Sequence, residues 1–440
     1  MFAVENQIKN IVGLDFVEKD LEIVSSLFAN EIDGDIDFRV VYPQTAEEVQ
    51  KVVKLANEEN IPVYSSYESW FSHSDISGKN GIIFDFKRMN KIEKIDPKNL
   101  VVHIQRGVTF DQLIKELNRY DIELSLPVSA TSPYVTEQYV NRNTTMKAAR
   151  YPEVAVANMK VVLSDGDIHL TGSHALSEET ADHKEDGGPN LSQWYIGGRD
   201  IFGIVVRSTI WLFPKWNIRK MLSFGFDSKE EAAQFIREMP RRELCTGAIA
   251  MNKKMASEKF EKDADSLPEW TAMLIVEGVD DLVPYREKKI LSLADEKGGR
   301  NISDDLKDMD HLGEMPWYAD GRVQVGFYSR FDTISLFDDI VRNGGASLND
   351  TGQMIVSSHN GGCSWLEYDL KDSTLDTPRI TDITLKLNDK GALFNSPTGP
   401  LAGEMYANMD SSYIAHIKRI KKMIDPRNIL NPGLPMKNLV

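Results

Sequence analysis

A polar stretch late in the chain holds the side chains best suited to acid–base chemistry. It reads Ser357-Ser358-His359-Asn360-Gly361-Gly362-Cys363 and places an imidazole four residues before a thiol. Because imidazole exchanges a proton near neutral pH, we expect His359 to act as a general base, although a histidine of a solvated loop gives the same pattern. Arg330 is a second catalytic candidate, since a guanidinium binds a carboxylate substrate; a solvated arginine is the alternative.

Composition excludes several classes of protein. Two cysteines, Cys245 and Cys363, are too few for a disulfide framework, and the eight histidines show no pair at ligand spacing beside an acid, so no metal site is predicted. The net charge of −16 repels phosphate backbones and anionic lipid, so we expect neither nucleic acid nor a membrane as a partner. No run reaches transmembrane length and no basic, then apolar, leader opens the sequence, which favours a cytoplasmic location.

Strands and helices alternate in the first half of the chain. Thr45 with Glu48, and Thr109 with Gln112, are capping boxes that predict helices with apolar stripes behind them. Strands are expected at 61–64, 81–86, 100–105, 158–163 and 203–212, and 164–167 forms the turn of a hairpin that returns through 168–170. A polar loop is expected at 177–190. Such alternation builds α+β or α/β layers.

The chain of 440 residues is too long for one ordinary core, so two domains are expected. After Trp216 its character changes to a second αβ unit, with a helix at 230–238 and strands at 272–277 and 323–328. A basic helix, 416–422, follows near the end, and we expect it to present a solvated face to an acidic neighbour.

The order of several motifs resembles the FAD-linked oxidases of the vanillyl-alcohol oxidase and para-cresol methylhydroxylase (PCMH) family. The motifs that carry the resemblance span most of the chain and weaken between 217 and 400. They are Tyr42 to Val63, Gly81 to Ile92, Val108 to Leu113, Asn158 to Leu176, Phe202 to Pro214, and the ending Asp425 to Gly433.

The resemblance implies an α+β, two-domain PCMH-type FAD-binding fold with an αβ cap. Residues 1–216, completed by 406–440, would form the FAD-binding-type domain, and 217–405 the cap or substrate domain. The flavin ring would lie between them, and FAD would be the cofactor.

The resemblance also locates the cofactor contacts, and here the sequence departs from the family. Diphosphate binding needs backbone N–H groups at close approach, which usually requires glycine. The loop after Val63 carries none: its expected cofactor-binding residues are Ser65, Ser66, Tyr67, Glu68, Ser69 and Trp70. A second segment, 127–138, has also lost its glycines and would contribute Ser132. The third contact is kept as Gly203-Ile204-Val205.

Two functions are the leading hypotheses, and a third, an enzyme that uses this fold without flavin, also stays open. In the first, the chain is an FAD-dependent oxidoreductase that moves a hydride from a small alcohol, hydroxy acid or activated C–H group to flavin, with His359 as base or as flavin tether. In the second, it is a flavin-deficient, non-catalytic subunit that pairs with a flavin-bearing paralogue or a redox partner in an oligomer. The family's phenolate-binding Tyr-Arg pair is missing from the matching stretch here, Phe394-Asn395-Ser396-Pro397-Thr398, which argues against a phenol substrate.

Overall fold

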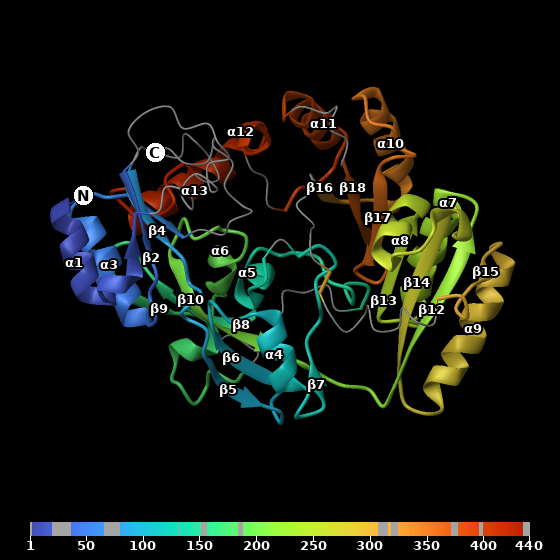
Figure 1. Ribbon diagram of the computed structural model, residues 1–440, viewed down its shortest axis with the longest axis horizontal. Coiled ribbons are helices and arrows are strands. Elements are labelled where there is room, and N and C mark those ends of the chain that lie inside the picture. Colours follow the sequence, from blue (N-terminus) through green and yellow to red (C-terminus); the bar gives the residue numbers. More distant parts are fainter. Residues whose placement is uncertain are drawn as a thin grey trace.

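A computed structural model describes residues 2–19, 37–65, 80–130, 132–150, 156–183, 188–306, 316–317, 324–370, 377–395 and 399–433. Its helices and strands form two neighbouring units, with the N-terminal half on the left of Figure 1 and a large antiparallel sheet on the right. The predicted positions Ser66 to Trp70 lie outside the described residues.

The N-terminal layer is a small sheet covered by two helices. Four strands run in the order β1 (Val17–Glu18), β2 (Asp37–Val41), β4 (Asn80–Phe84) and β3 (Val63–Ser65). The helices are α1 (Phe2–Val12) and α3 (Ala46–Glu58). The predicted cap of α3 is confirmed, because Thr45 Oγ1 accepts the Glu48 N–H at 3.1 Å.

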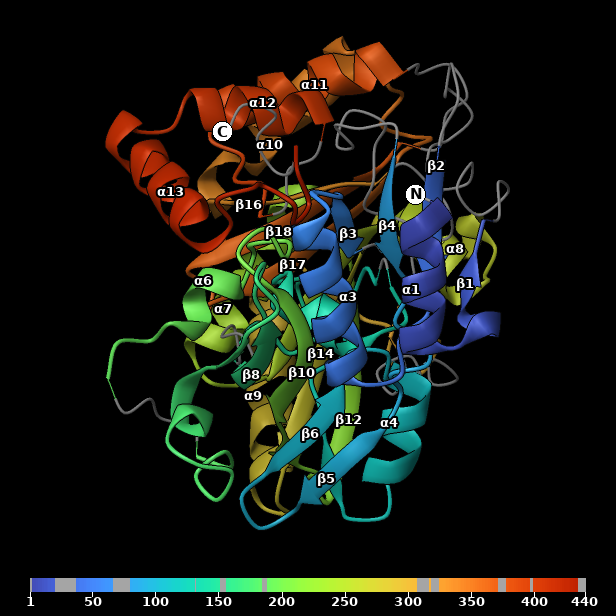
Figure 2. The ribbon, with the colours of Figure 1, turned by 90° about the vertical axis from the view of Figure 1, so that its left-hand side faces the viewer.

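A second sheet continues the N-terminal half (Figure 2). Its order is β5 (Ile92–Asp96), β6 (Val101–Gln105), β10 (Ile204–Trp211), β8 (Val156–Val162) and β9 (Ile168–Leu170). Helices α4 (Phe110–Leu117), α5 (Val135–Val140) and α6 (Ser192–Tyr195) and the strand pair β7 (Ile122–Glu123) and β11 (Phe213–Pro214) accompany it. The predicted Thr109 cap and the hairpin of β8 with β9 are both confirmed.

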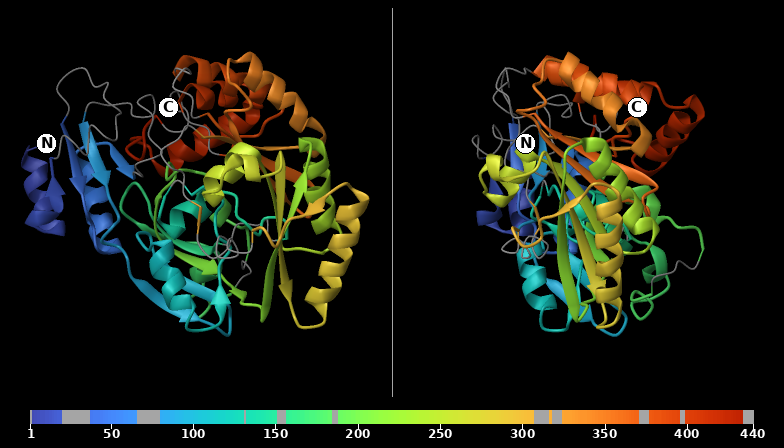
Figure 3. Two further views of the ribbon diagram at one scale, coloured as in Figure 1. Left: turned by 45° about the vertical axis from the view of Figure 1, so that its right-hand side comes forward. Right: turned by 90° about the vertical axis from the view of Figure 1, so that its right-hand side faces the viewer.

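A seven-stranded sheet dominates the rest of the chain. Its order is β15 (Arg300–Asn301), β12 (Ile218–Phe226), β14 (Trp270–Gly278), β13 (Gly247–Asn252), β17 (Gly352–Ser358), β18 (Cys363–Asp369) and β16 (Gln324–Ser329). Helices α7 (Lys229–Arg241), α8 (Lys253–Phe260), α9 (Leu282–Glu296) and α10 (Ile334–Asn343) connect its strands, and α11 (Thr377–Asp389) follows β18 (Figure 3). In chain order, α7 lies between β12 and β13, and α10 lies between β16 and β17, so the two halves of the sheet begin with the same strand–helix–strand pattern. This repeat was not predicted from the sequence.

Both faces of the seven-stranded sheet are buried, and this ties the two units together. One face packs with α7, α9 and α10 in a core that includes Phe235 and Phe337. The opposite face contributes Met273 and Val356 to a core shared with Val102 and Leu113 of the N-terminal half. The two units therefore share a continuous apolar core, so side chains from both can line one site with fixed geometry.

The C-terminal segment returns to the N-terminal sheet. After α12 (Gly399–Ala407) and α13 (Ser411–Ile424), Leu430 bridges Val63 of β3 in parallel. The prediction of a wholly solvated basic helix is wrong at one position, since Lys421 is buried and paired with Asp425 at 2.7 Å. Its ammonium also donates to the backbone oxygens of Ile201 and Leu430, so it fastens the segment to the sheet.

The expected α+β class is confirmed by this mixture of helices and mainly antiparallel sheets. The domain limits at 216, 217–405 and 406 stay a proposal. Sheet membership supports them, because β1 to β11 stay in the first three sheets and β12 to β18 build the fourth.

Candidate functional site

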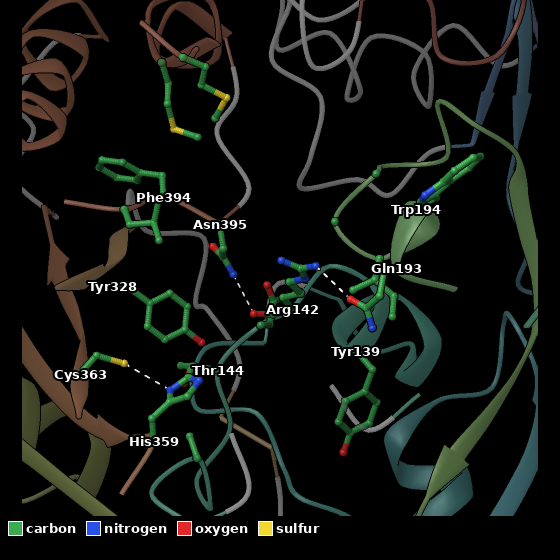
Figure 4. Close-up of a pocket in the computed structure, with 18 of the residues that line it drawn as sticks. Tyr139, Arg142, Thr144, Gln193, Trp194, Tyr328, His359, Cys363, Phe394 and Asn395 are labelled. Carbon is green, nitrogen blue, oxygen red and sulfur yellow. Dashed lines mark hydrogen bonds between the residues drawn. The ribbon is translucent and has the colours of Figure 1, made fainter. Parts of the chain in front are cut away.

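A cavity of about 980 Å³ lies between the two units. Its walls come from the segment after α5, the α6 region, the end of β16, the β17–β18 turn, residues 391–395 and helices α12 and α13. This volume is at the upper end of the range for sites that enclose a cofactor or a small molecule. The cavity is the candidate active site, and Figure 4 shows its polar residues.

His359 lies in this cavity at the tip of the β17–β18 hairpin. The tip docks on the N-terminal half through two backbone bonds, from His359 N to the Ala148 oxygen at 3.2 Å and from Asn360 N to the Ala149 oxygen at 2.8 Å. His359 and Asn360 both have a positive φ of 52°. Because such a conformation is uncommon outside glycine, the docked tip fixes the place of the imidazole.

The imidazole of His359 is held through one nitrogen only. Nδ1 lies 2.8 Å from Ser358 Oγ and 3.3 Å from Cys363 Sγ, whereas Nε2 has no protein partner among the described residues. When Nδ1–H donates to Ser358 Oγ, Nε2 keeps its lone pair and can accept a proton. Burial raises the pKa of the Cys363 thiol, so this sulfur stays protonated and uncharged near neutral pH.

Tyr328 faces the same space from β16. Its ring packs edge-on against Trp365 at 5.1 Å between centroids, and Figure 4 shows its hydroxyl directed into the cavity. Burial raises the pKa of this phenol, although a hydrogen bond with Thr144 and, more weakly, the Arg142 guanidinium oppose the rise. A neutral phenol can therefore donate a hydrogen bond to a bound ligand.

The charge of the cavity contrasts with that of the whole chain. The chain carries 67 Asp and Glu residues against 51 Lys and Arg. Among the described residues that line the cavity there is no carboxylate, while Arg142, Arg330, His359 and His416 are all present. Aromatic and apolar side chains make up much of the remaining wall. Such a site favours an anionic ligand with a flat or apolar part.

Arg330, the second candidate from the sequence, also borders the cavity. Its side chain is 77% exposed and its Nε donates to Asp332 Oδ1 at 2.9 Å. The structure therefore brings His359 and Arg330 to one cavity, but Arg330 lies at the rim and its charge is paired with Asp332. Phe394, where the family's Tyr-Arg pair was expected, is buried against Phe327.

The two segments predicted to contact the diphosphate also converge. Ser65, at the end of β3, donates through Oγ to Asp200 Oδ2 at 2.7 Å. Arg106 donates to the same carboxylate at 2.5 Å and to Glu137 Oε1 at 2.9 Å. Glu137 belongs to the second predicted segment. A buried network of Arg106, Asp200 and Glu137 therefore links the two segments.

The other predicted cofactor residues are buried in the same region. Ser132 Oγ accepts the Tyr134 N–H at 3.1 Å. Ile204 and Val205 are buried in β10, and the Val205 N–H donates to Asp200 Oδ1 at 3.2 Å. Gly203 has no space for a side chain, since an added Cβ would meet Val161 Cγ1 at 2.5 Å. Their assignment to cofactor binding stays a prediction.

The cavity and this network test the fit of FAD separately. The cavity, between the two units and lined with aromatic side chains, suits a flavin ring. Between the segments predicted to contact the diphosphate, Arg106 is already paired with Asp200 and Glu137, and the Asn431 amide is bonded to Ser65 and to the Arg199 oxygen. The cavity therefore fits a flavin ring, whereas the polar groups of the segments predicted to contact the diphosphate are bonded to one another.

Two residues of the cavity were missed by sequence reasoning, Arg142 and Tyr328. Arg142 stands between Asn141 and Asn143, and asparagine is common at the end of a helix, as it is here after α5. Tyr328 lies on the less buried face of the alternating strand β16, where it packs partly against the core shared by the two units. Neither signal predicts which distant segment the side chain faces.

Comparisons with known proteins agree with this architecture. Residues 39–172 match the FAD binding domain model, and residues 402–434 match the C-terminal domain of FAD linked oxidases. A D-lactate dehydrogenase from Archaeoglobus fulgidus is 23% identical over 92% of both chains. The 4-cresol dehydrogenase [hydroxylating] flavoprotein subunit of Pseudomonas putida is 28% identical over 44% of this chain and 38% of that protein.

A solved structure has the same fold over nearly the whole chain. The crystal structure of p-cresol methylhydroxylase with substrate bound superposes with a TM-score of 0.83, covering 98% of this chain and 96% of the other at 18% identity. Two segments of the chain therefore match domains of the FAD-linked oxidases, and the chain has the PCMH-type fold. FAD is the cofactor named by the matched binding domain. No helix within the described ranges is both long and apolar enough to span a bilayer.

Proposed function

We propose that the chain is an FAD-dependent oxidoreductase that oxidises a small 2-hydroxy carboxylic acid. The observation that carries the proposal is the composition of the cavity, which holds cationic and imidazole side chains but no described carboxylate in an otherwise acidic protein. The similarity to a D-lactate dehydrogenase over most of both chains points to the same substrate class.

The described residues suit the steps such a reaction needs. His359 Nε2 is positioned to remove the proton of the substrate hydroxyl, because its other nitrogen is anchored by Ser358. Tyr328 can donate a hydrogen bond to the same oxygen or to the carboxylate. Bound FAD supplies the acceptor for the hydride that leaves the hydroxyl-bearing carbon.

A phenol is disfavoured as substrate. The stretch 394–398, where the family's phenolate-binding pair was expected, contains no Tyr-Arg pair, and its Phe394 is buried in the core of the seven-stranded sheet. The cytoplasmic location predicted from the sequence stays a prediction, as does oligomer formation.

A visible spectrum of the purified protein, before and after incubation with FAD and gel filtration, tests the first half of the proposal. Absorption bands that remain in the protein fraction support FAD binding; bands that remain in an acid-precipitated pellet indicate a covalent link. Loaded protein is then assayed with a dye acceptor against lactate and glycolate, with p-cresol as comparison. Turnover of p-cresol but of neither hydroxy acid would overturn the substrate class.

A second candidate function is a flavin-deficient subunit of a heteromeric enzyme. The observation that favours it is the internal network, because Arg106 is neutralised by Asp200 and Glu137 where a diphosphate was expected. A colourless protein that retains no FAD after incubation, and that co-purifies with a flavin-bearing paralogue when the two are expressed together, would favour this candidate over the first.

A further inference from the structure

Arg142 is a cation of the cavity that no carboxylate of the described residues neutralises. Its Nη2 donates to the amide oxygen of Gln193 at a long 3.4 Å, and no described acid forms an ion pair with it. By contrast, Arg330 at the rim is paired with Asp332. Arg142 is itself exposed, but it lines the aromatic-walled cavity, and a guanidinium with donors left over can form paired hydrogen bonds to a ligand carboxylate.

The backbone of Arg142 is held in a conformation that a side-chain-bearing residue seldom adopts. Its φ is 60°, in the left-handed region. The turn is closed by bonds from Arg142 N to the Tyr139 oxygen at 3.2 Å and from Asn143 N to the Gln138 oxygen at 3.0 Å. An arginine kept in this conformation beside a cavity indicates that surrounding contacts determine its position.

One of those contacts crosses from the cap. Asn395 Nδ2 donates to the backbone oxygen of Arg142 at 2.7 Å, although 253 residues separate the two. Figure 4 shows this bond, with Arg142 between Tyr328 and His359 on one side and Gln193 on the other. Through this bond, Asn395 of the second unit holds the backbone from which the Arg142 guanidinium extends.

We propose that Arg142 binds the carboxylate of the substrate and that Asn395 is its positioning residue. This inference rests on the proposed function and names the group that selects the substrate class. A carboxylate bound at Arg142 leaves the adjacent hydroxyl-bearing carbon within the part of the cavity that holds His359 and Tyr328. The selected ligands are small monocarboxylates that carry a 2-hydroxyl group.

The first test compares a hydroxy acid with its methyl ester in FAD-loaded protein. Arg142→Met should raise KM for lactate by about 10- to 100-fold, the usual effect of losing a charge-assisted bond, while turnover of methyl lactate changes little. Arg119→Met is the matched control, because Arg119 is exposed just after the end of α4 and does not line the cavity. Loss of acid-over-ester preference in Arg330→Met, but not in Arg142→Met, would overturn the assignment.

The positioning role of Asn395 needs its own readout. Asn395→Ala should raise KM for lactate several-fold with kcat little changed. Added guanidinium ion should lower KM in Arg142→Ala, where it fills the vacated place, and should leave Asn395→Ala unchanged. Equal rescue of both variants, or an effect of Asn395→Ala on kcat alone, would contradict the positioning role.

Binding of oxalate to the protein separates this inference from the proposed function. Oxalate offers the carboxylate but no oxidisable hydroxyl, and its binding can be followed by quenching of tryptophan fluorescence, since Trp194 lines the cavity. Quenching in the parent protein and in Arg119→Met, but not in Arg142→Met, supports the carboxylate site even if no hydroxy acid is oxidised. Quenching that is the same in all three proteins would overturn the Arg142 site while leaving the proposed function in place.

Discussion

Arg106 donates to Asp200 at 2.5 Å in the interior of the N-terminal half, and both side chains are buried. The same guanidinium donates to Glu137 and lies over the ring of Phe86 at 4.3 Å. One cation therefore faces two carboxylates away from water. Since Asp200 also accepts from Ser65 and from the Val205 N–H, Glu137 is the less compensated acid of the network.

The stability of the protein should depend on the protonation of Glu137. Burial, opposed by Arg106 and reinforced by Asp200, raises the pKa of this carboxyl to about 7. An acid with a raised pKa binds more protons in the folded than in the unfolded state, so its contribution to stability falls as pH rises from about 4.5 to above 7. Glu137→Gln should therefore be more stable than the parent at pH 8 and similar to it at pH 5.5.

Thermal midpoints of both proteins at the two pH values measure this difference. Asp111→Asn, on α4, is a control acid of the same unit and should shift the midpoint equally at both pH values. A Glu137→Gln variant that is less stable than the parent at pH 8 would show that the ion pair with Arg106 outweighs the cost of burial.

The buried pair of Lys421 and Asp425 predicts a large effect from a small change. Side-chain exposure is 1% for Lys421 and 0% for Asp425. Lys421→Met would leave a buried carboxylate without its cation, which costs about 3–5 kcal/mol in comparable pairs. The neighbouring Lys422 is exposed, so Lys422→Met should stay within about 0.5 kcal/mol of the parent. Urea unfolding distinguishes the two, and equal effects would contradict the structural role of the pair.

Short-range features of the fold were predictable from sequence. The helix caps at Thr45 and Thr109 depend on residues three positions apart, and the β8–β9 hairpin depends on one tight turn. Lys421 could not be assigned in this way. A run of lysines and arginines indicates a solvated face, and only the return of the chain to Ile201 shows that one of them is buried.

The candidate site was predictable only in part, for the same reason. His359 was proposed because its residue type suggests chemistry, and its own hairpin places it in the cavity. Arg142 has no such signal, since its role depends on Gln193, 51 residues away, and on Asn395, 253 residues away. Residue type predicts the kind of chemistry, whereas long-range packing decides which side chains share a cavity.

Replacing Gly203 distinguishes a role in core packing from direct contact with the cofactor. An alanine Cβ at this position would lie 2.5 Å from Val161 Cγ1 and 3.3 Å from Tyr195 Cε1. We expect Gly203→Ala to lower the free energy of unfolding by about 1–3 kcal/mol, as overpacked core positions do. Gly403, exposed in α12 with nothing within 4 Å of an added Cβ, is the matched control, and Gly403→Ala should stabilise by up to about 1 kcal/mol. Loss of FAD binding in Gly203→Ala at unchanged stability would favour direct cofactor contact instead.

His359 should be needed for turnover but not for the fold. Asparagine is the best replacement, because it tolerates the positive φ of 52° and keeps a polar side chain at the hairpin tip. Loss of a general base lowers rates by about 10²- to 10⁴-fold, so kcat of FAD-loaded His359→Asn with lactate should fall within that range. Cys363→Ser, which changes only the 3.3 Å sulfur contact to Nδ1, should retain most of the activity. If His359→Asn keeps a kcat close to that of the parent, while both proteins have the same thermal midpoint, the proton is removed by another group and Tyr328 becomes the residue to replace next.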